Sequence, residues 1–248
     1  FADADFTKRH RLAAVNSINW ARIAAQVAYY VSSCLALGDR PLTFSVPTGN
    51  FGDVFAGYVA KQMGAPIRKL IVATNVNDIL TRALKTGVYA RGQVHATMSP
   101  AMDIQVSSNF ERLIFEAHNR DGVAVRALLG EFARSGSLPL SPSALAAMRQ
   151  TFGAARVDEN ETLAVIRRVY DETGRIIDPH TAVGVAGAPS EGPVVMLATA
   201  HPAKFPDAVE KSIGIRPALP ERLNWILTAP ERYDTLPNDA AALKRHIG

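Results

Sequence analysis

The chain has 248 residues, 48% of them hydrophobic, so it can bury a substantial core as one large domain or one and a half. Its 27 basic and 23 acidic side chains are dispersed, which argues against a nucleic-acid surface, and the net charge of +4 suits an anionic ligand without requiring one. The single cysteine excludes an intrachain disulfide and a cysteine-based metal site, and no apolar run is long enough to predict a membrane span.

The first half of the chain alternates between helix and strand patterns. Apolar residues at the helical period predict a helix from Arg11 to Leu37, which Gly38 ends. The following patterns predict a strand at 42–46, a helix at 53–63, a strand at 68–73 and a helix at 77–85. This alternation indicates a parallel sheet covered by helices, with the loops after the strands on the edge where open α/β sheets bind ligands.

The second half is mainly helical. Helices are predicted at 107–118, 123–134, 143–152 and 160–173, the last with Asn160 as N-cap. An apolar run from Pro193 to Ala198 predicts a buried strand that leads into a polar turn at 199–202. A proline-punctuated tail at 217–237 precedes a short helix at 240–247. The expected fold class is α/β, an open, mostly parallel twisted sheet flanked by helices.

The segment Ser45–Asp53, with the sequence Ser-Val-Pro-Thr-Gly-Asn-Phe-Gly-Asp, carries the strongest chemical signal. Gly49 and Gly52 can adopt positive φ and let backbone amides approach an anion. Those amides, together with the helix N-terminus, can bind a phosphate group. The loop has neither the lysine of a Walker loop nor the spacing of the dinucleotide fingerprint. On the glycines alone, an ordinary strand-to-helix turn fits equally well.

A polar stripe follows the first predicted helix. Asn19, Arg22 and Gln26 are three and four residues apart and therefore share one face, next to core-like neighbours. A solvated helix face is the ordinary explanation of such a stripe. Arg22 is the best candidate for anion binding because a guanidinium group pairs bidentately with phosphate. Amides near Asn16 and Ser17 would add donors at the helix start.

Residues 48–53, Thr-Gly-Asn-Phe-Gly-Asp, resemble the cofactor-phosphate loop of threonine synthases. These are pyridoxal-phosphate enzymes of the tryptophan-synthase-β-like group, fold type II. Further stretches resemble the same family in the same order, at 16–22, 73–80, 99–104 and 199–205. The resemblance covers nearly the whole chain and is weakest at 124–153 and in the C-terminal tail.

The resemblance implies a cytoplasmic lyase of threonine biosynthesis. Its cofactor would be pyridoxal 5′-phosphate, and its small-molecule substrate O-phospho-L-homoserine, which reacts with water to give L-threonine and phosphate. The cofactor-binding residues that it implies are Gly49, Asn50, Phe51, Gly52, Asp53 and Thr199. The substrate-binding residues that it implies are Asn16, Ser17, Arg22 and the side chain of Asn50, with Asn19 a weaker candidate.

Several of these positions have an ordinary structural explanation as well. Asn50 suits a turn, and Asp53 is expected to cap or open the helix, so that its amide is a better phosphate ligand than its side chain. Without the resemblance, Thr199 is a strand-end turn residue. With it, the neutral hydroxyl of Thr199 would bond the pyridine nitrogen and make the ring a milder electron sink. His180 is expected to pack or form a turn. Residues 99–103 and 107–109 could line the cleft or simply cap the helix at Ser107, and capping is favoured.

The resemblance also implies that the chain is the C-terminal part of the enzyme. The lysine that forms the Schiff base belongs to a Phe-Lys-Asp segment upstream of the Asn-Ser motif, and no lysine of this chain lies in that context. No catalytic residue is therefore assigned, and the chain alone is expected to be inactive, with the upstream half of the same enzyme as its partner. No membrane or nucleic-acid partner, metal site or histidine pair of metal-binding spacing is expected.

The regions expected within this part are an α/β region at 1–122 that binds cofactor phosphate and substrate, a helical insertion at 123–158, the rest of the cofactor domain at 159–215 and a tail at 216–248. Two other functions remain open. A related β-eliminase, similar to serine or threonine dehydratases, has the same fold, although the 16–19 and 199–205 stretches argue against it. A non-catalytic protein that binds a phosphorylated ligand is the second alternative.

Overall fold

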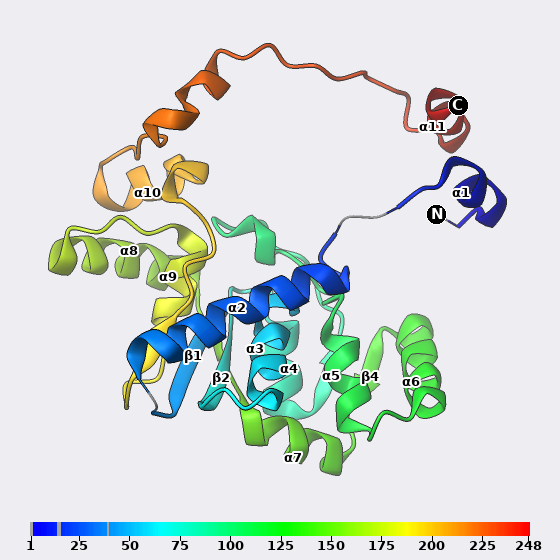
Figure 1. The fold of residues 1–248 in the computed structure, drawn as a ribbon, viewed down its shortest axis with the longest axis horizontal. Coiled ribbons are helices and arrows are strands. Elements are labelled where there is room, and N and C mark those ends of the chain that lie inside the picture. Colours follow the sequence, from blue (N-terminus) through cyan, green and yellow to red (C-terminus); the bar gives the residue numbers. More distant parts are fainter. Residues whose placement is uncertain (1, 14–15, 39) are drawn as a thin grey trace. The chain divides into compact units, whose positions relative to one another are not determined.

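The computed structural model describes residues 2–13, 16–38 and 40–248 (Figure 1). The chain divides into two compact units. The core unit spans Ser17–Pro217, and the terminal unit combines Phe1–Asn16 with Ala218–Gly248. In the terminal unit, Lys244 on α11 pairs with Asp3, the N-cap of α1. Its helices are α1 (Ala4–His10), η3 (Glu221–Leu227) and α11 (Ala240–Ile247), and α11 confirms the short helix expected at 240–247.

The core unit is built on a parallel sheet of four strands in the order β5-β2-β1-β6. These strands are β1 (Leu42–Pro47), β2 (Ile67–Thr74), β5 (Phe152–Arg156) and β6 (Val194–Met196). A separate antiparallel pair joins β3 (Val88–Ala90) to β4 (Ser137–Pro139). The helices are α2 (Trp20–Leu37), α3 (Gly52–Gln62), α4 (Ile79–Thr86), η1 (Pro100–Met102), α5 (Phe110–Ala117), α6 (Gly122–Ser135), α7 (Pro142–Thr151), α8 (Glu159–Thr173), α9 (Pro179–Ala186), η2 (Pro202–Lys204) and α10 (Pro206–Ile213).

Strand β1 is buried along its whole length, and its alternating side chains separate the two faces of the sheet. Phe44 packs against Tyr30 of α2, with ring centroids 4.8 Å apart. The Ser45 hydroxyl points to the other face and donates to the Gly184 carbonyl of α9 at 2.5 Å. Helices therefore cover both faces, as the predicted α/β class requires.

The contact between α2 and α3 depends on Gly57. A Cβ atom at this position would lie 2.6 Å from the Tyr30 ring and 2.8 Å from Leu70 of β2. Glycine therefore lets α3 lie close to both neighbours. This packing fixes the position of the first turn of α3, immediately after β1.

Several sequence expectations about element boundaries are wrong. The first long helix begins at Trp20 rather than Arg11, because the Asn19 side chain accepts from the Ala21 amide at 2.9 Å and caps it. Asp158, not Asn160, is the N-cap of α8, in a capping box with Glu161. Strand β6 is partly exposed rather than buried, because it lies at the end of the strand order.

Strand β5 was not expected. The sequence Phe-Gly-Ala-Ala-Arg pairs with β2 from Leu70↔Phe152 to Thr74↔Arg156, directly after α7 ends at Thr151. Its small residues give no run of β-branched side chains. These residues must be small because their neighbours lie close: a Cβ at Gly153 would lie 2.8 Å from Ile71, and one at Gly187, the C-cap of α9, would lie 3.1 Å from Ala155.

We expect Gly57→Ala to lower the free energy of unfolding by about 1–3 kcal/mol through overpacking against the buried Tyr30 ring. Gly130→Ala is a matched control in α6, where the nearest atom to an added Cβ is the mobile end of Arg134 at 3.8 Å. The control should be unchanged or more stable by up to about 1 kcal/mol. Urea unfolding of both variants is the measurement, and equal stabilities would contradict the packing argument.

Candidate anion and cofactor site

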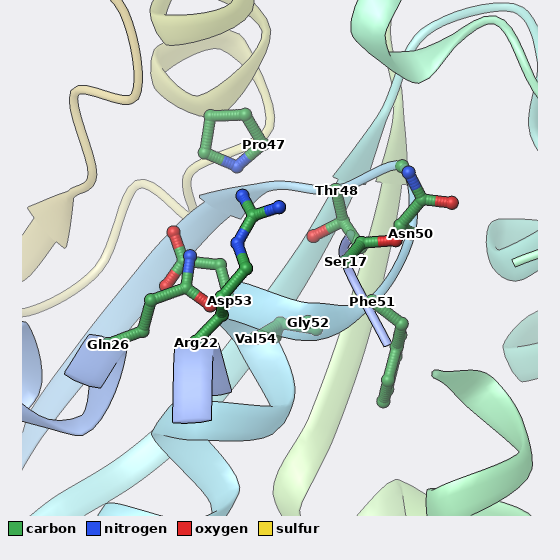
Figure 2. A pocket seen from close by; sticks show the side chains of 11 residues that line it. Ser17, Arg22, Gln26, Pro47, Thr48, Asn50, Phe51, Gly52, Asp53 and Val54 are labelled. Carbon is green, nitrogen blue, oxygen red and sulfur yellow. The ribbon is translucent and has the colours of Figure 1, made fainter. Parts of the chain in front are cut away.

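A cavity of about 130 Å³ lies where β1 ends and α3 begins (Figure 2). Its wall comes from the segment at the start of α2, the end of β1 and the first turn of α3. The lining residues are Ser17, Arg22, Gln26, Pro47, Thr48, Gly49, Asn50, Phe51, Gly52, Asp53 and Val54. The structure therefore brings the predicted phosphate loop together with two of the residues predicted to bind substrate.

The peptide groups of this loop leave their amides available. Among the described residues, no hydrogen bond is donated by a backbone amide from Gly49 to Val54. The carbonyls are occupied instead: Ser107 Oγ donates to Gly49 O at 2.8 Å, and the backbone N–H of Asn109 donates to Asn50 O at 3.1 Å. A row of unpaired N–H groups at a helix N-terminus is an anion-binding arrangement.

The backbone turn uses a residue that the sequence did not indicate. Neither Gly49 nor Gly52 has positive φ; Phe51 has, at 64°. Its ring is 1% exposed and packs near Phe110 and Phe152, with centroids 5.2 Å and 5.6 Å away. Figure 2 shows the ring pointing away from the Arg22 guanidinium group. Aromatic packing thus offsets the strain of a left-handed residue.

Gly49 is required for a steric reason. A Cβ atom there would lie 2.6 Å from the Ala101 carbonyl oxygen, a backbone atom that cannot easily move aside. At Gly52 the nearest atom would be 3.5 Å away, an ordinary contact. The expectation of positive φ at both glycines is therefore wrong, and only Gly49 is explained by close backbone approach.

Arg22 and Gln26 lie one helical turn apart on α2, and both line the cavity, as the shared helix face predicted. Figure 2 shows both side chains among the residues that line the cavity. Arg22 is exposed and takes part in none of the ion pairs found between described residues. Asn19 caps α2, and Asn16 belongs to the terminal unit and is not part of the lining.

Asp53 lies in the first turn of α3 but makes no capping hydrogen bond, contrary to the capping role expected of it. The Tyr30 hydroxyl donates to its Oδ1 at 3.1 Å and to its backbone carbonyl at 2.9 Å. Burial raises the pKa of Asp53 from 3.8 to about 6, and the Tyr30 hydrogen bond opposes this only in part. The carboxyl group therefore becomes neutral under mildly acidic conditions, next to the cavity.

Thr199 lies exposed beyond β6 and borders two further hollows. A cavity of about 420 Å³ is lined by Thr199 together with Gln26 and Asp53. A second, of about 190 Å³, is lined by Thr199 together with Gly49 and Pro47. Each hollow shares residues with the anion cavity, so Thr199 lies near the phosphate loop, as predicted from its place after a strand.

His180 is buried at the start of α9. Its Nε2 accepts from the Ala101 amide at 3.3 Å, so Nδ1 carries the proton and donates to Asp178 at 2.9 Å. Burial raises the pKa of Asp178, but hydrogen bonds from His180 and Thr181 outweigh it and leave that pKa below its ordinary value. The packing role expected of His180 agrees with this geometry, because the histidine holds the segment that lies against Gly49.

Ser107 and Asn109 neither line the anion cavity nor cap a helix with a side-chain hydrogen bond, the two roles considered for this stretch from the sequence. Helix α5 begins at Phe110, and its N-cap Asn109 makes no side-chain capping hydrogen bond, so the expectation that Ser107 caps a helix is wrong. Both side chains instead donate hydrogen bonds to carbonyl groups of the phosphate loop, Ser107 to Gly49 and Asn109 to Asn50. A Ser-Ser-Asn run before a helix is typical of a cap, and local sequence gives no sign of a long-range partner.

Two observations concern other kinds of site. Across the described ranges, no group of three or more His, Cys, Asp or Glu side chains could hold a metal ion. None of the helices in the part of the chain that the structure describes has the length and apolar character of a membrane span.

The architecture is that of fold type II, the class of α/β enzymes that use pyridoxal phosphate. A threonine deaminase from Solanum lycopersicum, 16% identical, shares the fold with a TM-score of 0.54. A PLP-bound threonine synthase from Brucella melitensis superposes with a TM-score of 0.95 at 49% identity, over 100% of this chain and 55% of that one. The yeast threonine synthase superposes with a TM-score of 0.86 at 41% identity, over 93% of this chain and 52% of the yeast chain.

Sequence comparisons narrow the class to one family. A family model described as threonine synthase, C-terminal, matches residues 181–247. The threonine synthases of Pseudomonas aeruginosa and Corynebacterium glutamicum are 49% and 45% identical, over 100% and 99% of this chain and 54% of each relative. The chain belongs to the threonine synthase family and corresponds to its C-terminal part. It spans about half the length of these relatives.

We expect Asp53→Asn to stabilise the ligand-free protein at neutral pH. The folded state holds the Asp53 proton up to about pH 6 and the unfolded chain only to about 3.8, so the wild type loses stability as pH rises through this window. Asparagine cannot ionise and still accepts a hydrogen bond from Tyr30, so the stability of the variant should not fall as Asp53 of the wild type ionises. At pH 7.5 the free energy of unfolding of the variant should therefore exceed that of the wild type by about 1–2 kcal/mol.

The measurement is the difference in free energy of unfolding between Asp53→Asn and wild type at pH 4 and pH 7.5. Taking a difference at each pH cancels the titration of all other groups. A difference that stays constant between the two pH values would show that the Asp53 carboxyl group is not held neutral by the fold.

Proposed function

We propose that this chain is the cofactor-phosphate and substrate-binding part of a threonine synthase, acting on O-phospho-L-homoserine and water to give L-threonine and phosphate. The observation that carries the proposal is the cavity formed by unpaired amides at the start of α3 with Arg22 at its wall. The amides, with no lysine in the lining, fit the phosphate group of pyridoxal 5′-phosphate, and the Arg22 guanidinium group fits the phosphate of the substrate. The family membership supports the reaction.

The roles follow from the chemistry of each group. The amides from Gly49 to Asp53 would hold the cofactor phosphate. Ser17, Arg22 and the Asn50 side chain would hold the phosphate of the substrate, with Asn16 in the same role from the family motif. Bound pyridoxal phosphate supplies an electron sink for negative charge that develops on substrate carbons. Thr199 would bond the ring nitrogen through a neutral hydroxyl, which does not keep a proton on that atom.

A lysine is needed to bond the cofactor covalently. Lys204 on η2 shares a hollow with Thr199, so it is the candidate within the described chain. It is exposed, and its ammonium group lies 5.9 Å from the Phe205 ring centre. The family motif instead assigns this role to a lysine upstream of the Asn-Ser motif, and we propose that a longer polypeptide carrying this chain supplies that lysine. We also propose that this polypeptide is cytoplasmic.

The test is borohydride reduction of the full-length protein, followed by intact mass and peptide mapping, with phosphate release from O-phospho-L-homoserine assayed in parallel. One pyridoxyl-phosphate group on an upstream lysine, with L-threonine formed, supports the proposal. An adduct on Lys204 would overturn the assignment of the lysine. Dehydration of serine or threonine without turnover of the phosphorylated substrate would indicate a β-eliminase, and phosphate-ligand binding without an adduct or turnover would indicate a non-catalytic protein.

Arg22→Gln should weaken use of the phosphorylated substrate. Removing one charge-assisted phosphate contact is expected to raise KM by about 10–100-fold, since such bonds are the stronger class of hydrogen bond. The pyridoxal absorbance of the purified protein should remain. Arg126→Gln, an exposed arginine on α6 that does not line the anion cavity, is the matched control. Equal kinetics for both variants would remove Arg22 from the substrate site.

A further inference from the structure

Asn109 connects the two sides of the anion cavity. Its side chain is fully buried just before α5. Nδ2 donates to the Ser17 carbonyl at 2.9 Å and to the Asn50 carbonyl at 2.9 Å. Ser17 belongs to the segment before α2 and Asn50 to the phosphate loop, and these two segments come together in the lining of the cavity. One amide group therefore ties both of them.

The orientation of this amide is fixed from its other end. Arg112 Nε donates to Asn109 Oδ1 at 3.1 Å, one turn further along α5. With the amide reversed, Oδ1 would face two carbonyl oxygens and Nδ2 would face a guanidinium group, which leaves every contact repulsive. Arg112 thus stabilises, from the Oδ1 end, the orientation in which Nδ2 reaches both segments.

Arg112 is itself anchored to the segment at the start of α2. Its Nη2 donates to the Ile18 carbonyl at 2.9 Å, and its guanidinium carbon lies 5.5 Å from the Trp20 ring centre. A guanidinium group over an aromatic face is a favourable cation–π contact. Asn109 and Arg112 therefore form a chain of contacts from Trp20, through α5, to the phosphate loop.

We propose that Asn109 is a positioning residue for the anion cavity and that Arg112 acts through it. The pair holds the carbonyls of Ser17 and Asn50 on the side away from the ligand, so that the amides of the phosphate loop face the anion. For the phosphate of pyridoxal 5′-phosphate this rests on the proposed function. Neither residue lines the cavity, which separates the pair from the residues that bind the ligand directly.

A double-mutant cycle on the full-length protein tests the pair. Asn109→Leu keeps about the size of the side chain and adds no charge, but it has no N–H to donate, so affinity for pyridoxal 5′-phosphate should fall by about 10–100-fold. Arg112→Met keeps an apolar group beside Trp20 and should cost about 3–10-fold. Because Arg112 acts partly through Asn109, the loss of affinity in the double variant should be smaller than the product of the losses in Asn109→Leu and Arg112→Met.

Additive losses of binding free energy in the double variant would overturn the proposal, because they would show that the two substitutions act independently. Arg120→Met, which removes an exposed arginine paired with Glu116, is the control and should bind like wild type. If Asn109→Leu does not fold, Asn109→Ser completes the cycle. If wild type binds no pyridoxal phosphate, the proposed function fails. The same cycle with inorganic phosphate as probe then decides the role of the pair.

Discussion

A peptide group offers a carbonyl on one side and an amide on the other, and this constraint governs the site. Ser107 and Asn109 hold the carbonyls of Gly49 and Asn50, so the amides of the loop and of the first turn of α3 turn toward the cavity. Placing that turn correctly requires α3 to lie close to α2 and β2, which Gly57 permits. The sheet, the helix packing and the loop together fix the orientation in which the loop amides face the cavity.

Much of the core unit could be predicted from the pattern of the sequence. Strands β1 and β2 are apolar runs between turn residues, and helices α2 and α3 follow the 3.6-residue period, so the parallel arrangement and the ligand edge follow from local signals. Strand β5 could not be found in this way. Its residues are small because neighbouring side chains pack closely against them, and this tertiary packing cannot be read from local β propensity.

The candidate site shows the same division. The phosphate loop and Thr199 follow predicted strands, and Arg22 lies on the polar face of a predicted helix. The structure places all three around adjoining hollows. Ser107 and Asn109, which donate to the loop carbonyls, are distant from the loop in the sequence and resemble ordinary helix caps. Asp53 likewise appears in the sequence as a helix-opening acid, and only the packed structure shows that burial beside Tyr30 alters its pKa.

Phe51 has a consequence for how the protein gains its ligand site. A left-handed phenylalanine is unfavourable in an isolated segment and persists here because its ring packs near Phe110 and Phe152, which are far along the chain. Without those aromatic partners this shape of the loop is less favourable by about 1–2 kcal/mol. An anion that binds this loop would therefore stabilise the packing of Phe51 against Phe110 and Phe152 as well as the turn itself.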